Sequence, residues 1–170
     1  MGARPAGAAT ALLLARAGVR VLAVDRGAYG ADTLSTHALM RGAAHQLASW
    51  GALARITASG TPPVTTTTFH YGPDELTVDI KPRGSVDALY APRRTVLDAV
   101  LVDLAREASA DVRHGVRLGG LRWERGRVAG ATLIDGQGDE HRVATGIVVG
   151  ADGMGSLVAR QVAAERYLEG

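Results

Sequence analysis

Two glycines and one acid near the start of the sequence have the spacing of a nucleotide-binding site. Gly2 and Gly7 bound the stretch GARPAG, and Asp25 follows Gly7 by 18 residues. A glycine turn that opens a helix presents backbone N–H groups and the helix dipole to a pyrophosphate. An acid about 20 residues later accepts hydrogen bonds from the ribose hydroxyls and repels a 2′-phosphate, so the pattern favours FAD or NAD over NADP.

The glycine pattern departs from the usual G-x-G-x-x-G in two ways. Arg4 stands where the middle glycine is normally found, although a guanidinium there is able to bind phosphate with two parallel hydrogen bonds. Only Met1 precedes Gly2, so we expect the strand that leads into such a turn to be lacking. An ordinary α/β turn with closely packed glycines stays open as the alternative.

A second candidate site is the stretch GADGMGSLVAR at 150–160. It predicts a strand that ends at Asp152, a turn at Gly153 and Gly155, and a helix capped near Ser156. This arrangement places a carboxylate and free N–H groups at the carboxyl edge of a sheet, where open α/β folds bind ligands. A helix start that is merely capped is the competing interpretation.

A third candidate is Arg94, which falls in the first turn of a predicted helix, where a cation opposes the helix dipole. Such a position suggests an anionic partner, for which Arg93 is an alternative ligand and a surface arginine the simpler interpretation. Of the histidines, only His37 lies in a loop that would approach such a ligand, and none has metal-ligand spacing.

Composition excludes several classes of function. A net charge of +2 with dispersed arginines argues against nucleic-acid binding. No apolar run reaches the roughly 18 residues of a membrane span, and the lack of cysteine fits a reducing cytoplasm. The sequence has no P-loop motif, and Ser156 does not stand in the G-x-S-x-G context of a hydrolase. We therefore expect a cytoplasmic protein without a metal site, and we assign no catalytic residue.

The elements that must position these residues follow from periodicity and turn signals. The predicted helices are 5–17, 36–50, a short one ending near Gly60, 93–108 and 156–168. The predicted strands are 19–24, 64–71, 75–82, 111–118, 120–134 and 141–149. Together they indicate one domain over 1–170 with an α/β Rossmann-like fold, in which a mainly parallel sheet is joined by an antiparallel hairpin and a three-stranded meander.

These motifs, in this order, resemble the FAD-binding region of the para-hydroxybenzoate-hydroxylase-like flavoprotein monooxygenases and related FAD-dependent oxidoreductases. The resemblance rests on GARPAG with Asp25, on RRTVLD at 93–98 and on GADGMGSLVAR, and it runs from Gly2 to about Val162. It implies an FAD site that also lies near NAD(P)H. The cofactor-binding residues that it implies are Gly2, Ala3, Arg4, Ala6, Gly7, Asp25, Arg26, Arg41, Arg94, Leu118, Asp152 and Gly153.

The resemblance also implies an activity. In such enzymes NAD(P)H reduces the flavin, which then uses oxygen to hydroxylate a small organic substrate. The first strand, a later Gly-Asp motif and the substrate domain of the family are not found in these 170 residues, so a further segment or a second chain is expected to complete the site. Two other hypotheses remain open, namely a truncated fragment that binds nucleotide without catalysis and an NAD-dependent dehydrogenase.

Overall fold

The computed structural model of the protein describes residues 1–35, 38–84 and 86–165. It divides into two compact units, of which the first comprises Met1–Ala31 and Leu101–Gly170 and the second Asp32–Val100. Helix α4 (Arg94–Glu107) begins in the second unit and continues into the first. Each unit is described by itself below, and the single domain over 1–170 stays a prediction.

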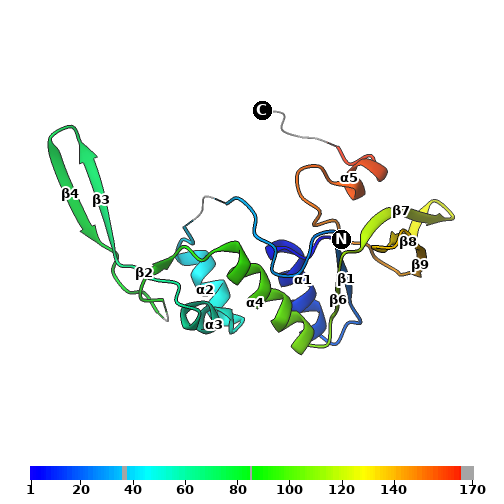
Figure 1. The fold of residues 1–170 in the computed structure, drawn as a ribbon, viewed down its shortest axis with the longest axis horizontal. Helices are drawn as coiled ribbons and strands as arrows, with labels where there is room; N and C mark the ends of the chain where they lie inside the picture. The colour runs from blue at the N-terminus through cyan, green and yellow to red at the C-terminus, as the bar shows by residue number, and fades with distance from the viewer. Residues whose placement is uncertain (36–37, 85, 166–170) are drawn as a thin grey trace. The chain divides into compact units, whose positions relative to one another are not determined.

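The first unit contains the helices and strands that carry the glycine turn and Asp25. Its elements are α1 (Pro5–Arg16), β1 (Leu22–Asp25), β6 (Asp111–His114), β7 (Arg117–Glu124), β8 (Arg127–Ile134), β9 (Glu140–Ala144) and α5 (Leu157–Gln161). Strands β1 and β6 are parallel, with Leu22 opposite Asp111 and Asp25 opposite His114. Strands β7, β8 and β9 form an antiparallel sheet (Figure 1). The mixed α/β fold with a parallel sheet, hairpins and a three-stranded meander is confirmed.

A small apolar cluster joins these two sheets. Val24 of β1 packs with Ala131 and Leu133 of β8, and all three side chains are almost fully buried. Half-buried apolar residues on β7 and β9 surround this cluster. Strand β8 lies between β7 and β9, and every one of its residues after Arg127 is buried or half-buried.

The second unit is built on two short helices and two pairs of strands. Its elements are α2 (Arg41–Ser49), α3 (Ala52–Ala58), β2 (Pro63–Val64), β3 (Thr66–Tyr71), β4 (Asp74–Asp79) and β5 (Leu89–Tyr90). Its core holds Leu47, Ile56 and Val86, each 5% exposed or less. Strands β3 and β4 form a hairpin that extends away from α2 and α3, and every residue in both strands is exposed (Figure 1).

Several predicted boundaries differ from the structure because hydrogen bonds at the ends of the elements decide them. Strand β1 begins at Leu22 and not at Val19, since the Val19 amide donates to Leu14 and closes the end of α1. The helix predicted over 36–50 begins at Arg41, because Leu39 forms a β-bridge to Tyr90; residues 36–37, including His37, lie outside the described part.

The region 111–149 also differs. It holds four strands rather than three, since Arg125 and Gly126 turn the chain between β7 and β8. Residues 145–152 are not in a strand, and Ile147 is 79% exposed. Two hydrogen bonds join this stretch to Met1, whose amine donates to Val149 O (2.7 Å) and whose carbonyl accepts from Ala151 N (2.7 Å). Helix α5 ends at Gln161, well before the predicted 168.

Candidate functional site

Asp25 ties the glycine turn to the loop that follows β1. Its Oδ2 accepts a hydrogen bond from the Ala3 amide at 2.8 Å, and its Oδ1 accepts one from the Gly27 amide at 2.7 Å. A carboxylate offers about four acceptor positions, so these two bonds leave room for ribose hydroxyls. The structure therefore brings together the first two features that the sequence singled out, the glycine turn and the acid.

The start of α1 has the geometry of an anion site. Arg4 is the N-cap residue, its side chain is exposed, and no side chain caps the helix. Pro5 has no N–H to satisfy, and the Ala6 and Gly7 amides belong to the first turn, whose N–H groups have no partner within the helix. Backbone donors, helix dipole and the Arg4 guanidinium thus all favour a negatively charged group.

Both glycines of the turn are required by close backbone packing. A Cβ atom built at Gly7 would overlap the Gly2 carbonyl oxygen and lie 2.8 Å from the carbonyl carbon. A Cβ at Gly2, whose φ is +89°, would strike the Ala151 carbonyl. These contacts bring the turn against α1 and against residues 149–152, as the glycines of a dinucleotide-binding turn do.

The Asp152 carboxylate caps helix α5. It accepts hydrogen bonds from the Ser156 hydroxyl, from the Leu157 amide (2.7 Å) and from the Val158 amide (3.3 Å). Burial by itself raises the pKa of Asp152, but these hydrogen bonds outweigh it and hold the pKa below its usual value. The neighbouring Gly153 has a φ of +81° and open space around its Cα. The capped helix start, one of the two interpretations of this motif, is thus present.

The remaining predicted residues of the first unit have different surroundings. Arg26 follows Asp25 directly and is exposed. Leu118, on β7, is half-buried and packs against the cluster of Val24, Ala131 and Leu133. The roles of both side chains toward a cofactor stay predictions.

The sequence did not reveal a cluster of polar and aromatic side chains around Tyr29, which includes the strand partner of Asp25. Tyr29 donates a hydrogen bond to Asp103 (2.7 Å), its ring lies 5.6 Å edge-on from that of His114, and the Arg106 guanidinium covers it at 5.1 Å. Burial, together with the charge of Arg106, lowers the pKa of His114. The only sequence signal was the aromatic residue shortly after Asp25, because the pairing of Asp25 with His114 depends on strand register.

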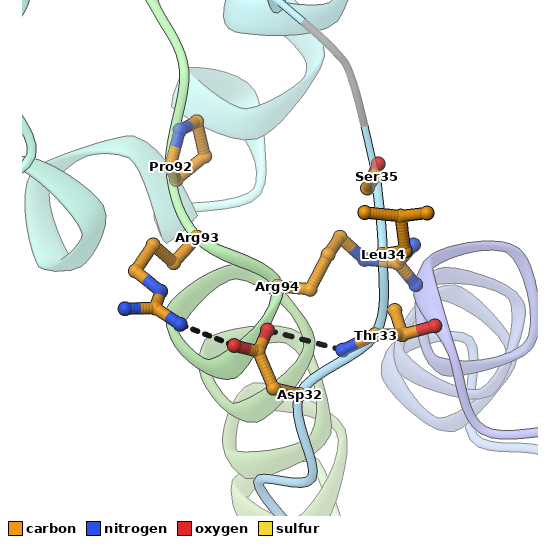
Figure 2. A pocket seen from close by; sticks show the side chains of 7 residues that line it. All are labelled: Asp32, Thr33, Leu34, Ser35, Pro92, Arg93 and Arg94. Carbon is orange, nitrogen blue, oxygen red and sulfur yellow. Dashed lines mark hydrogen bonds and ion pairs between the residues drawn. The ribbon is translucent and has the colours of Figure 1, made fainter.

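The second unit holds a pocket at the start of α4. The pocket has a volume of about 430 Å³ and is lined by segments 32–35 and 92–94. Figure 2 shows the two arginines leaving the helix in different directions: Arg93 pairs with Asp32, and Arg94 extends toward the segment of Thr33 and Leu34. The ion pair with Arg93 lowers the pKa of Asp32.

Arg94 is not a solvated surface residue. Its side chain is 15% exposed, and its Nε and Nη2 atoms donate to the two carboxylate oxygens of Asp98 at 2.7 and 2.8 Å. Arg41, at the first position of α2, is half-buried and outside the pocket lining. The i,i+4 spacing of Arg94 and Asp98 is a signal that the sequence already contained.

Two classes of site find no support in the described structure. No group of three His, Cys, Asp or Glu side chains among residues 1–35, 38–84 and 86–165 has the arrangement of a metal site. Over the same residues, none of the helices has the length and apolar character needed to span a membrane.

The residues of the first unit fit a dinucleotide cofactor such as FAD. Its pyrophosphate requires an uncapped helix start next to closely packed glycines, and its ribose requires an acid at the end of the following strand. Gly2, Gly7 and Asp25 provide these features. The Ala3 amide, which binds Asp25, keeps the turn and the acid at a fixed distance.

Three solved structures illustrate the fold that this chain shares with known proteins. A flavoprotein/dehydrogenase from Cytophaga hutchinsonii is 20% identical with a TM-score of 0.80, and the match covers 99% of this chain and 42% of that one. A geranylgeranyl bacteriochlorophyll reductase-like protein from Thermoplasma acidophilum is 23% identical with a TM-score of 0.80, over 99% and 42%. The flavin-dependent monooxygenase PieE, solved with FAD and substrate, is 25% identical with a TM-score of 0.75, over 95% and 31%.

The chain therefore spans less than half the length of each of these three proteins. Among curated proteins, no sequence matches it. The sequence model of the FAD binding domain, in contrast, matches residues 1–170. With the glycine turn, Asp25 and the fold in agreement with that match, the chain belongs to the FAD binding domain family.

Proposed function

We propose that this chain is the FAD-binding part of a flavin-dependent monooxygenase that takes electrons from NAD(P)H and hydroxylates a small organic substrate. The observation that carries the proposal is the double hydrogen bond of Asp25, which joins the glycine turn at Ala3 to the loop at Gly27 beside an uncapped helix. The family match and the flavin-dependent neighbours support it.

The start of α1, Asp25 and the turn at 152–153 each have a defined task in this proposal. The amides of Ala6 and Gly7 and the Arg4 guanidinium bind the pyrophosphate, because they are the donors at the start of α1. The Asp25 carboxylate accepts hydrogen bonds from the ribose hydroxyls, through the lone pairs that the Ala3 and Gly27 amides do not use. Gly153 leaves room for close approach of a ligand, while the Asp152 carboxylate keeps the adjoining turn in place through its helix cap.

The flavin supplies the redox chemistry when it is bound, and the protein binds, orients and shields it. For the second unit we propose that Arg94 and Arg41 are cofactor-binding residues. We also propose that a substrate domain outside residues 1–170, in the same or a second chain, completes the enzyme, since the solved relatives are more than twice as long.

The test is the retention of FAD by the purified 170-residue chain. FAD is added, free cofactor is removed by desalting, and the visible absorption of the retained flavin is measured. The proposal predicts retained FAD, its loss in Asp25→Ala, and no comparable retention of NAD. A folded chain that retains NAD but not FAD would favour the NAD-dependent dehydrogenase, and a folded chain that binds neither would favour a fragment without a cofactor.

The hydroxylation step needs a second measurement. The FAD-loaded chain is mixed with NADH or NADPH without oxygen, and bleaching of the flavin absorption reports hydride transfer. Several neighbours are flavin-dependent halogenases or brominases. The completed enzyme is then supplied with candidate substrates and oxygen, with and without halide. If it yields halogenated product with halide and no hydroxylated product in either case, hydroxylation is the wrong activity.

A further inference from the structure

Arg94 and Asp98 form an ion pair that is largely shielded from solvent. Asp98 is the only buried polar or charged residue in the part of the chain that the structure describes, at 9% exposure. Removing both charges from water carries a penalty that an ion pair often fails to repay. Arg94 also occupies the first turn of α4, where a cation opposes the dipole, and basic-before-acidic is the weaker order for an i,i+4 pair.

The geometry of the pair fixes the arginine within the pocket wall. The two parallel bonds to Asp98 hold the plane of the guanidinium in line with the plane of the carboxylate. They use two of the five N–H donors of Arg94, so three donors remain for another acceptor. Because Arg94 lines the pocket and Asp98 does not, these donors are available to a ligand there.

The second ion pair at the pocket is much more exposed to solvent than the pair of Arg94 and Asp98. Arg93 and Asp32 also pair, but their side chains are 76% and 48% exposed. An exposed pair contributes little and is readily exchanged with water. Of the two arginines at the start of α4, Arg94 is therefore the one whose orientation is set before any ligand arrives.

We propose that Asp98 is a positioning residue, which holds the Arg94 guanidinium ready to donate hydrogen bonds to FAD in this pocket. The inference rests on the proposed function, since it takes FAD as the ligand. Asp98 acts only through Arg94 and does not itself touch the cofactor. A bond donor whose orientation is fixed in advance binds more tightly than one that must first be ordered.

The experiment is a double-mutant cycle on FAD affinity with the full chain. Kd for FAD is measured by flavin fluorescence titration for wild type, Asp98→Asn, Arg94→Ala and the double variant. Asp98→Asn is expected to raise the Kd for FAD about tenfold when Arg94 is present. In the Arg94→Ala background, the same substitution is expected to raise it less than about twofold. Asp98→Glu, which keeps the charge, is expected to restore part of the affinity. Asp111→Asn, which breaks the exposed pair with Arg113 on β6, is the matched control and leaves Kd unchanged.

Stability is followed separately by thermal unfolding without FAD, because Asp98→Asn leaves the Arg94 guanidinium buried without a carboxylate partner. If Asp98→Asn does not fold, Arg94→Met/Asp98→Leu removes both charges and is compared with Arg94→Met alone; equal Kd values support the inference. An effect of Asp98→Asn that is as large without Arg94 as with it overturns the inference, and so does a Kd within twofold of wild type. Wild type that binds no FAD overturns the proposed function together with this inference.

Discussion

Gly7→Ala tests whether the close packing at the start of α1 is what the glycine turn requires. The added Cβ would overlap the Gly2 carbonyl oxygen and lie 2.8 Å from the carbonyl carbon. Carbon atoms in contact prefer about 3.5–4.0 Å, so the turn and the helix must separate by at least about 0.7 Å. The neighbouring atoms are backbone, and therefore no side-chain rotation relieves the overlap.

The magnitude follows from two opposing contributions. Alanine is favoured over glycine within a helix by about 1 kcal/mol. Overpacking a well-packed contact costs about 1–3 kcal/mol, and an overlap with backbone lies at the upper end. The free energy of unfolding is therefore expected to fall by about 2 kcal/mol, and FAD binding to weaken by at least about tenfold because the donors of the turn move.

Gly42→Ala is the matched control. Gly42 lies in α2, its Cβ would meet nothing within 4 Å, and alanine there is expected to stabilise the protein by about 0.5–1 kcal/mol. Both variants are measured by urea unfolding followed by far-UV circular dichroism, with FAD titration in parallel. The reasoning is refuted if Gly7→Ala unfolds at the same or higher urea concentration than wild type and binds FAD as tightly.

Three further predictions concern individual side chains. Asp25→Ala leaves the Ala3 amide without its acceptor and is expected to weaken FAD binding by about 1–3 kcal/mol; calorimetric titration checks this, and an unchanged affinity contradicts the ribose contact. Ser156→Ala removes the α5 cap and a bond to Asp152, and should cost about 1 kcal/mol in urea unfolding, whereas the exposed Ser49→Ala should not. The pKa of His114 is lowered in the folded state, so its stabilising contribution is present above the unfolded pKa of about 6.5 and is lost as pH falls below it. His114→Gln should therefore flatten the decline in stability between about pH 7.5 and pH 5.5, and an unchanged decline would show that other groups cause it.

The helices could be predicted from the sequence because their signals are local. The start of α1 follows from Pro5 and its end from Gly18, and α4 follows from its apolar period. Strand limits depend on partners that lie far away in the sequence. Residues 145–152 are apolar enough for a strand, yet they form no regular strand, and the backbone of Val149 and Ala151 bonds to Met1.

The same distinction applies to the candidate site. The glycine turn and Asp25 were expected together because their spacing belongs to one helix–strand unit, and the structure joins them through Ala3. The side chains around Tyr29 come from three separate segments, so only the folded chain brings them together. Asp98 lay within a stretch that the sequence had singled out, but its burial against Arg94 is a property of packing.

The exposed hairpin of β3 and β4 is expected to be less stable locally than the two cores of the chain. One side carries Thr68, hydrogen-bonded to Thr77, and the other carries the stacked rings of Phe69 and Tyr71, yet neither side is covered. A two-stranded hairpin without such cover is marginally stable, and segments of this kind open long before the cores that they adjoin. Its amides are therefore expected to exchange with deuterium first, and the tip at Gly72 offers a place to attach a reporter dye or insert a tag that leaves both cores intact.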